Sequence, residues 1–207
     1  MRRILPFILL LMSSALSPLL TAATMPEKNL LIVGDSISAA YGISPEKGWV
    51  SLLSNKITQS KKPYQVINAS ISGDTTANGL NRFKPLLEKY KPAVVIIELG
   101  GNDGLRGLSI KQMKNNLKKM IELSQKNKAR IILAGMKIPP NYGKRYTEAF
   151  YQVYQDLSKI YNLELIPFLL DGIGNKPELM QADGIHPTDE AQPYIMKQIW
   201  EKLERLL

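Results

Sequence analysis

The chain has 207 residues, enough for one domain at roughly 150 residues per domain, and its 27 Lys and Arg against 18 Asp and Glu give a formal net charge of +9. It contains no cysteine and a single histidine, His186. Disulfides, thiolate metal sites, cysteine nucleophiles and multi-histidine zinc sites are therefore excluded, and His186 is the only imidazole available for acid–base chemistry.

The first 23 residues have the three-part pattern of a cleaved secretory signal. Two arginines at positions 2 and 3 precede an apolar run over 4–20, and small residues at 21–23 come before the polar sequence Pro26-Glu27-Lys28. We expect cleavage after Ala23, which leaves one mature domain over 24–207; the alternative is an uncleaved membrane anchor. Because an exported protein without disulfides fits a bacterial periplasm, we expect a periplasmic location.

After residue 28, short runs rich in Val and Ile alternate with segments of helical periodicity. Runs of this length indicate strands that are buried on both faces. Strands that alternate with helices pair in parallel through right-handed crossovers. The sequence therefore predicts an α/β domain with a five-stranded parallel sheet and helices on both faces. The predicted strands are Leu30–Val33, Val66–Ala69, Ala93–Leu99, Ile131–Ala134 and Leu163–Phe168.

Four segments have the apolar spacing of helices. One covers 110–121, where Ser109-x-x-Gln112 forms a capping box at the start. Two others cover 150–160 and 195–206, and a fourth covers 80–90, where Pro85 should bend the helix. The Lys-rich stretches lie mostly on the polar faces and lack interleaved aromatic residues, which favours a solvated surface over nucleic-acid binding.

The residues that follow the strands are the candidates for chemistry, because ligands of an open parallel sheet bind at the carboxyl ends of its strands. Four short motifs occupy such positions or precede the last helix. They are Gly34-Asp-Ser-Ile-Ser38, Ser70-Ile-Ser-Gly-Asp74, Gly100-Gly-Asn-Asp-Gly104 and Asp183-Gly-Ile-His-Pro187.

The four motifs together hold the groups that acyl transfer needs. Ser36 can act as a nucleophile if His186 removes its proton, and Asp183, three residues upstream, can hold the other ring nitrogen. A tetrahedral intermediate needs hydrogen-bond donors for its oxyanion. The backbone N–H groups of Ser36 and Gly73 and the side-chain amide of Asn102 can supply three.

Each motif is a weak signal by itself. Gly-Asp-Ser arises by chance, Gly-Gly-Asn-Asp-Gly is more often a tight turn, and Asp-x-x-His is more often a surface or capping pair. Their occurrence together, in a workable order, favours a catalytic site. The sequence lacks the Gly-x-Ser-x-Gly nucleophile elbow, a phosphate-binding loop and a dinucleotide fingerprint. We therefore expect no metal and no cofactor.

Residues 29–205 resemble the SGNH, or GDSL, hydrolases, whose four blocks match at Ser36, Gly73, Asn102 and His186. The resemblance is strongest to the periplasmic multifunctional acyl-CoA thioesterase/protease/lysophospholipase (arylesterase) group. It implies a three-layer α/β/α sandwich of the flavodoxin-like kind. It also implies a nucleophile at Ser36, a base at His186, an orienting acid at Asp183 and oxyanion donors from Ser36, Gly73 and Asn102. Ile37 and Ala40 depart from the expected Leu and Gly beside the nucleophile.

We therefore expect a serine esterase that hydrolyses fatty acyl esters, acyl thioesters or lysophospholipids through an acyl-enzyme. Its partner is a small-molecule acyl ester or thioester, which membrane-derived lipids could supply, and we expect a monomer without a nucleic-acid partner. Two alternatives stay open. One is an aryl or carbohydrate (acetyl) esterase of the same fold, and the other is a periplasmic anion-binding module without turnover.

Two segments beside Ser36 are candidates for an acyl groove. Residues 75–80 follow Gly73, and residues 138–143 follow the fourth predicted strand. We expect both to be loops that form a mobile apolar wall, the alternative being that they only connect strand to helix. The candidate substrate-binding residues are Thr75, Gly79, Leu80, Ile138 and Tyr142.

Overall fold

A computed structural model describes residues 28–207 of the chain. The predicted signal sequence over 1–23 lies outside the described residues. Over 28–207, no helix combines the length and the apolar character needed to cross a membrane.

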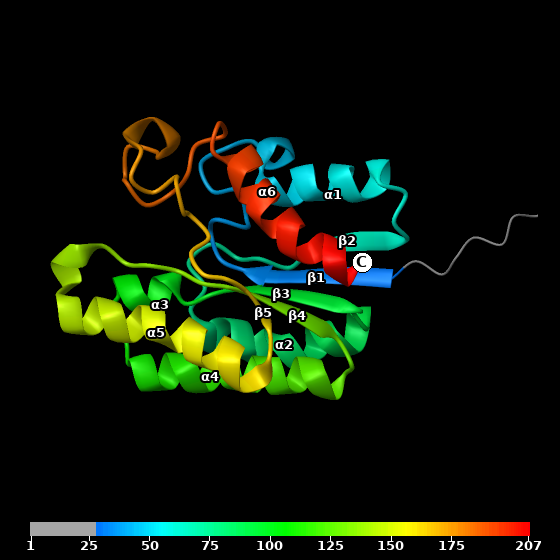
Figure 1. The fold of residues 1–207 in the computed structure, drawn as a ribbon, viewed down its shortest axis with the longest axis horizontal. Helices are drawn as coiled ribbons and strands as arrows, with labels where there is room; N and C mark the ends of the chain where they lie inside the picture. The colour runs from blue at the N-terminus through cyan, green and yellow to red at the C-terminus, as the bar shows by residue number, and fades with distance from the viewer. Residues whose placement is uncertain (1–27) are drawn as a thin grey trace, which may run out of the picture.

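Five parallel strands form a single sheet with the order β2-β1-β3-β4-β5 (Figure 1). The central strand β3 is buried along its whole length, as expected for a continuous apolar run covered on both faces. The predicted α/β fold with a five-stranded parallel sheet is therefore confirmed. The strands are β1 (Lys28–Gly34), β2 (Tyr64–Asn68), β3 (Val94–Glu98), β4 (Arg130–Ala134) and β5 (Glu164–Ile166).

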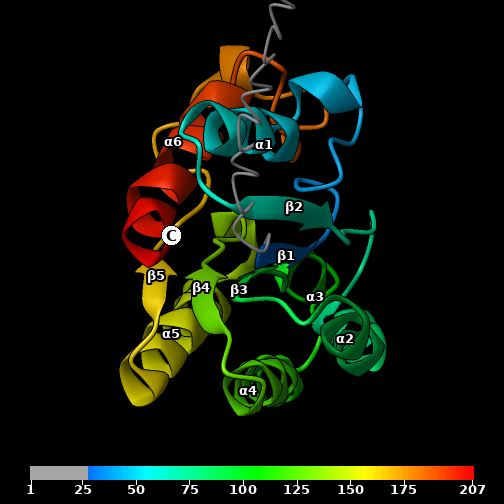
Figure 2. The same cartoon turned by 90° about the vertical axis from the view of Figure 1, so that its right-hand side faces the viewer.

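Helices cover both faces of the sheet and give the molecule three layers (Figure 2). On one face α1 packs against α6, and on the other α4 packs between α2 and α5. The helices are α1 (Trp49–Gln59), α2 (Thr76–Tyr90), α3 (Gly101–Leu105), α4 (Ile110–Lys126), α5 (Lys144–Tyr161) and α6 (Gln192–Leu203). Short 3₁₀ turns lie at Pro45–Lys47, Pro140–Tyr142, Pro177–Leu179 and Glu204–Leu206.

The strand order places a topological switch point between β1 and β3. The crossover from β1 to β2 passes through α1 on one face, whereas the crossover from β2 to β3 passes through α2 on the other. A crevice therefore opens at the carboxyl ends of β1 and β3, where ligands of such sheets bind. The motifs that contain Ser36 and Asn102 directly follow these two strands.

The segment 75–80 differs from the prediction of a loop. Thr75 is the N-cap of α2, and its side chain accepts a hydrogen bond from the backbone N–H of Asn78 at 3.3 Å. Gly79 is buried in the first turns of this helix, where a Cβ would overlap the side chain of Leu99. Gly79 is therefore a close-packing position rather than a hinge.

Candidate active site

Ser36, His186 and Asp183 form one chain of hydrogen bonds, although Ser36 and His186 lie 150 residues apart in sequence. The Oγ of Ser36 is 2.9 Å from Nε2 of His186, and Nδ1 of His186 is 2.6 Å from Oδ2 of Asp183. The structure thus brings together the three residues that the sequence analysis selected as a candidate triad. The order of contacts is that of a nucleophile, a base and an orienting acid.

Asp183 is held as a carboxylate by its own turn. Its Oδ1 accepts hydrogen bonds from the backbone N–H groups of Ile185 at 2.9 Å and His186 at 3.0 Å. Desolvation acts to raise the pKa of Asp183, but the His186 ring and these backbone donors outweigh it and lower the pKa to about 2. A carboxylate that stays ionised can fix the Nδ1–H tautomer of His186 and stabilise the imidazolium form.

The three candidate oxyanion donors lie at the ends of β1, β2 and β3. Within residues 28–207, the backbone N–H groups of Ser36 and Gly73 donate no hydrogen bond to the protein. Gly73 has φ +83°, a left-handed conformation that favours glycine, and its carbonyl accepts a hydrogen bond from Nη2 of Arg106 at 3.0 Å. Nδ2 of Asn102 donates to Oδ2 of Asp35 at 3.2 Å, which leaves its second proton available.

Asp35 and Glu98 form a buried pair of carboxyl groups next to the turn that carries Ser36. The sequence analysis missed this pair. The register of β1 and β3 sets Gly34 beside Glu98, and a Cβ at position 34 would lie 2.5 Å from Oε2 of Glu98. This Glu98 oxygen accepts hydrogen bonds from the backbone N–H of Asp35 at 3.2 Å and from Oγ of Ser38 at 2.6 Å. The pair therefore fixes the turn on which Ser36 sits.

The two carboxyl groups cannot both be ionised at low cost. Burial raises the pKa of Asp35 to about 6, against the opposing effect of a hydrogen bond from the Ile37 N–H. Burial, and then the neighbouring Asp35, raise the pKa of Glu98 well above its ordinary range. Where two buried carboxyl groups lie this close, one of them tends to stay protonated. The signal that could have indicated it is Glu98 itself, a single acid at the end of an apolar strand.

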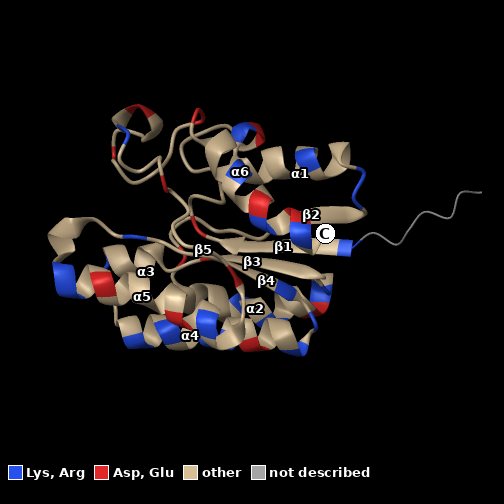
Figure 3. Cartoon of the chain, viewed as in Figure 1, with Lys and Arg blue, Asp and Glu red and all other residues tan. Residues whose placement is uncertain are grey.

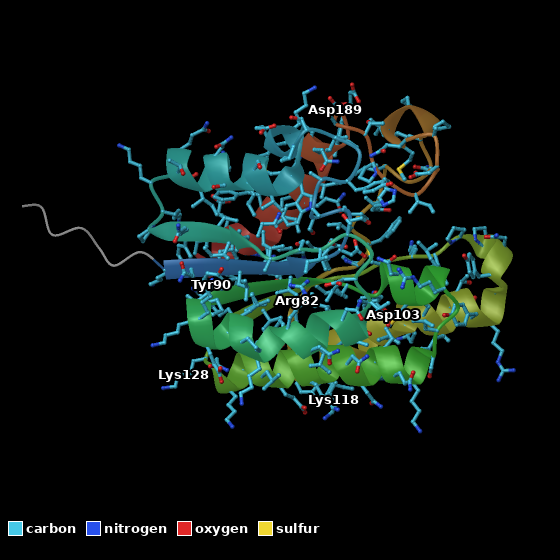
Figure 4. All side chains as sticks on the ribbon, turned by 180° about the vertical axis from the view of Figure 1, so that it is seen from behind. Arg82, Tyr90, Asp103, Lys118, Lys128 and Asp189 are labelled. Atoms are coloured by element: carbon cyan, nitrogen blue, oxygen red, sulfur yellow. The ribbon has the colours of Figure 1, made fainter. Side chains whose placement is uncertain are left out.

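Side chains of the surrounding loops hold the donors in place. Asp103, which is buried, accepts hydrogen bonds from the backbone N–H and the Oγ1 of Thr76 at 2.8 and 2.6 Å, so it ties α3 to the start of α2. Arg82 donates from Nε to Oδ2 of Asp74 at 2.8 Å and from Nη1 to the Ala69 carbonyl, so it braces the loop that carries Gly73 (Figure 4). Asp74 of the second motif and Asp103 of the third motif therefore hold loops in place.

The residues that flank Ser36 differ in their effect on the site. Ile37 lines the active-site cavity, so Ile in place of the expected Leu at this position affects the shape of that cavity. Ala40 has φ +57°, the left-handed region that an alanine adopts at a cost. Tyr41 lies against the His186 ring, with ring centroids 4.4 Å apart and the planes tilted by 38°.

A cavity of about 570 Å³ opens beside Ser36, Asn102 and His186. Its other walls are mostly apolar and come from the turn after β1, the end of α3, the segments after β4 and β5 and the loop that carries His186. These walls include Ile37, Leu105, Met136, Ile138, Pro139, Pro140, Phe168, Leu170, Met180 and Ile185.

The cavity is lined by one of the five candidate substrate-binding residues. Ile138 lines it, as the sequence analysis expected. Thr75, Gly79 and Leu80 do not, because they cap and begin α2. Tyr142 lies outside the cavity and donates its hydroxyl to the Leu105 carbonyl at 2.8 Å. The wall from the segment 168–180, which follows β5, was missed, since no short motif marks it.

Comparisons with known proteins agree with this architecture. Residues 32–192 match the family described as the GDSL-like lipase/acylhydrolase family. The chain is 46% identical over 198 residues to the esterase TesA of Pseudomonas aeruginosa, covering 96% of this chain and 98% of that protein. It is 42% identical to the thioesterase 1/protease 1/lysophospholipase L1 of Escherichia coli, covering 91% of this chain and 89% of that protein.

A solved structure shows the same similarity in three dimensions. The crystal structure of a psychrotrophic esterase EstA from Pseudoalteromonas sp., inhibited by monoethylphosphonate, superposes with a TM-score of 0.82 at 42% sequence identity. The match covers 86% of this chain and 98% of that chain. At this identity and coverage, the similarity extends over the whole described fold.

Proposed function

The chain belongs to the GDSL-like lipase/acylhydrolase family, and from that membership we propose that it hydrolyses fatty acyl esters, acyl thioesters and lysophospholipids through an acyl-enzyme on Ser36. The observation that carries the proposal is the 2.9 Å contact between Ser36 Oγ and His186 Nε2 at the wall of an apolar cavity. The chain is an ester or thioester hydrolase by its relatives, so the alternative of a binding module without turnover is set aside.

In the proposed mechanism, Nε2 of His186 accepts the Ser36 proton as Oγ attacks the acyl carbonyl. Asp183 keeps the Nδ1–H tautomer and stabilises the imidazolium that results. The imidazolium then gives its proton to the departing alkoxide or thiolate, which leaves an acyl-enzyme. Water repeats the same two proton transfers and releases a carboxylic acid and free Ser36.

We assign the oxyanion to the backbone N–H groups of Ser36 and Gly73 and the free amide proton of Asn102. The two backbone donors have no acceptor within residues 28–207, and the Asn102 amide is fixed by Asp35 before substrate arrives. Donors that are already oriented stabilise the developing charge without reorganisation in the transition state.

The apolar cavity favours a long acyl chain over an acetyl group. An acetyl group would leave most of the 570 Å³ empty, whereas a fatty acyl chain can bury methylene groups against the apolar walls. A carbohydrate acetyl esterase is therefore the weaker alternative. An aryl ester stays within the proposal, because its aryl group departs with the leaving oxygen.

We further propose that the protein is exported to the periplasm as a monomer after removal of residues 1–23. The basic, apolar and small-residue pattern of the leader supports export and cleavage. The test is the N-terminal sequence of the protein purified from the periplasmic fraction, which should begin near residue 24.

A series of p-nitrophenyl esters of increasing acyl length tests the substrate class. Because each buried methylene contributes up to about 0.8 kcal/mol, kcat/KM should rise by up to about fourfold per carbon until the cavity is full. Ile138→Ala should shift the preferred length while two-carbon ester hydrolysis persists. Ile160→Ala, an exposed isoleucine on α5, is the matched control and should keep the wild-type profile. A flat profile for the wild type would contradict the assignment.

A further inference from the structure

Most of the large exposed apolar side chains lie at the end of the molecule that holds the active-site cavity, and Ile185 lines that cavity. They lie in segments that follow the carboxyl ends of the strands, at the end of the molecule that also carries Ser36 and His186. These side chains are Tyr41, Ile71, Leu108, Tyr142 and Ile185, each between 38 and 52% exposed. An accumulation of exposed apolar groups at one site marks a surface that contacts something.

Part of this end of the molecule forms a continuous depression, which we call the rim patch. It lies where the start of α4 meets the start of α5, and it encloses about 440 Å³. The hydroxyl of Tyr146 donates to the Leu108 carbonyl at 2.9 Å, and that of Tyr142 donates to Leu105, so both tyrosine hydroxyls are already paired. The rim patch consists of Leu108, Ile110, Tyr142, Lys144, Arg145 and Tyr146.

The rim patch borders the active-site cavity. Leu105, which receives the Tyr142 hydroxyl, lines that cavity, and so do Pro139 and Pro140 directly before the Tyr142 turn. A molecule resting on the rim patch is therefore adjacent to the cavity wall.

The rim patch carries two cations, and the acid that approaches them is Glu148, 3.8 Å from Lys144. The segments 104–121 and 135–147 contain Lys and Arg but no Asp or Glu. Basic residues are visible at the start of α5 and along α4 (Figure 3). An excess of Lys and Arg in these two segments favours an anionic partner.

The two cations of the rim patch are placed against the preference of their helix. Lys144 and Arg145 occupy the first turn of α5, which holds no acidic residue, although the helix dipole disfavours cations there. Lys144 has Glu148 at 3.8 Å, but both side chains are mostly exposed, so this pair contributes little. Helix stability therefore does not account for the two charges.

We propose that the rim patch docks the protein onto lipid bilayers that contain anionic lipids, so that an acyl substrate passes from the bilayer surface into the cavity. Apolar and aromatic side chains beside Lys and Arg are the composition with which proteins bind such surfaces. The destination of the acyl chain rests on the proposed function, whereas docking itself needs no turnover. The two can therefore fail separately.

The binding test uses Ser36→Ala protein, so that no lipid is consumed. It should co-sediment with vesicles made of equal parts phosphatidylcholine and phosphatidylglycerol, and not with phosphatidylcholine alone. Each Lys or Arg near an anionic surface contributes about fivefold, so adding Lys144→Glu and Arg145→Glu should weaken binding by about 30-fold or more. Inorganic phosphate at the same concentration as the lipid should not compete, which distinguishes a bilayer surface from a single phosphate.

The matched control makes the same change of charge at a distance from the rim patch. It changes two exposed lysines to Glu, Lys84 on α2 and Lys128 in the turn after α4, of which Figure 4 labels Lys128. This pair should bind vesicles as the parent does. Equal loss in both pairs would overturn the proposal, because it would show attraction by net charge alone. Unchanged binding by the rim-patch pair, or binding to an acidic protein but not to vesicles, would also overturn it.

A second readout separates docking from folding and chemistry. Lys144→Glu and Arg145→Glu on the wild-type background should keep hydrolysis of a soluble two-carbon ester, because neither residue lines the cavity. Hydrolysis of a lysophospholipid carried in phosphatidylglycerol vesicles should fall at least tenfold. Since acids suit the first turn of a helix, the melting temperature should not drop. Equal rates on vesicles would contradict docking, whereas absent soluble-ester hydrolysis in the wild type would contradict the proposed function.

Discussion

The side-chain amide of Asn102 has two protons, and each has a separate role in the proposed site. Its amide donates one hydrogen bond to Asp35 at 3.2 Å, and the geometry leaves the other proton for the cavity that Asn102 lines. Asp35 is adjacent to Ser36 in the chain, so the donor and the nucleophile are fixed relative to each other by one carboxyl group. This arrangement orients the amide before a substrate binds.

Asn102→Ala should lower kcat by about 10²–10³, or roughly 2.7–4 kcal/mol, because it removes one oxyanion donor. KM should change less, since the oxyanion exists mainly in the transition state. Asn116→Ala is the control, because Asn116 donates a similar side-chain hydrogen bond to Thr76 Oγ1 at 3.1 Å but does not line the cavity. A loss of affinity with kcat intact would make Asn102 a substrate-binding residue instead.

At the scale of secondary structure, the buried strands were predictable and the starts of the helices less so. All five predicted runs overlap the strands of the sheet, because a strand covered on both faces must be apolar throughout. The predicted Leu163–Phe168 run is longer than β5, which ends at Ile166 because Pro167 has no N–H for the ladder. The sequence analysis predicted no helix at the positions of α1 and α3.

The start of α2 was hidden by its composition. Thr75, Asn78 and Gly79 are typical of loops in sequence, yet here they serve as a cap and as a close-packing position against Leu99.

The carboxyl pair of Asp35 and Glu98 could not be predicted for another reason. Their contact depends on the register between β1 and β3, which a strand pattern does not specify. The chemistry-bearing motifs were predictable because each directly follows a strand or precedes the last helix.

Gly135 sets how closely β4 and β5 approach each other at the end of the sheet. A Cβ at this position would overlap the backbone carbonyl of Pro167 and lie 3.0 Å from that of Ile166. Gly135→Ala should therefore reduce the free energy of unfolding by about 1–3 kcal/mol, as overpacking does when backbone cannot yield. Urea denaturation measures this change.

Gly174→Ala is the matched control for that measurement. Its Cβ would meet its nearest neighbours at 3.6–3.8 Å, which is ordinary van der Waals contact. The control should unfold within about 0.5 kcal/mol of the wild type, as most substitutions without steric conflict do. Equal stability of both variants would show that the contact between β4 and β5 relaxes freely.

For the molecule as a whole, two carboxyl groups of the site give opposite dependences of stability on pH. The pKa of Asp183 is lowered to about 2, so the stability it contributes is lost as pH falls through that value. The pKa of Asp35 is raised from 3.8 to about 6, so the folded state binds more protons than the unfolded state between these values. Stability from Asp35 is therefore present in acid and falls as pH rises through about 6.

Asp35→Asn should remove the second of these dependences, because the amide does not titrate. Relative to this variant, the wild type should lose free energy of unfolding as the pH is raised from about 4 to about 7. Urea denaturation of both proteins across this range gives the difference directly. A difference that does not change with pH would show that Asp35 has no raised pKa in the folded protein.

The central claim is that Ser36, activated by His186, becomes covalently acylated. The most direct measurement is reaction with a fluorophosphonate, followed by mass spectrometry of the intact protein and of its peptides. The account predicts one adduct per chain on the peptide that contains Ser36, no adduct in Ser36→Ala, and normal labelling of Ser70→Ala, a serine of the second motif. Labelling of Ser36→Ala at the wild-type rate, or an adduct on another peptide, would contradict it.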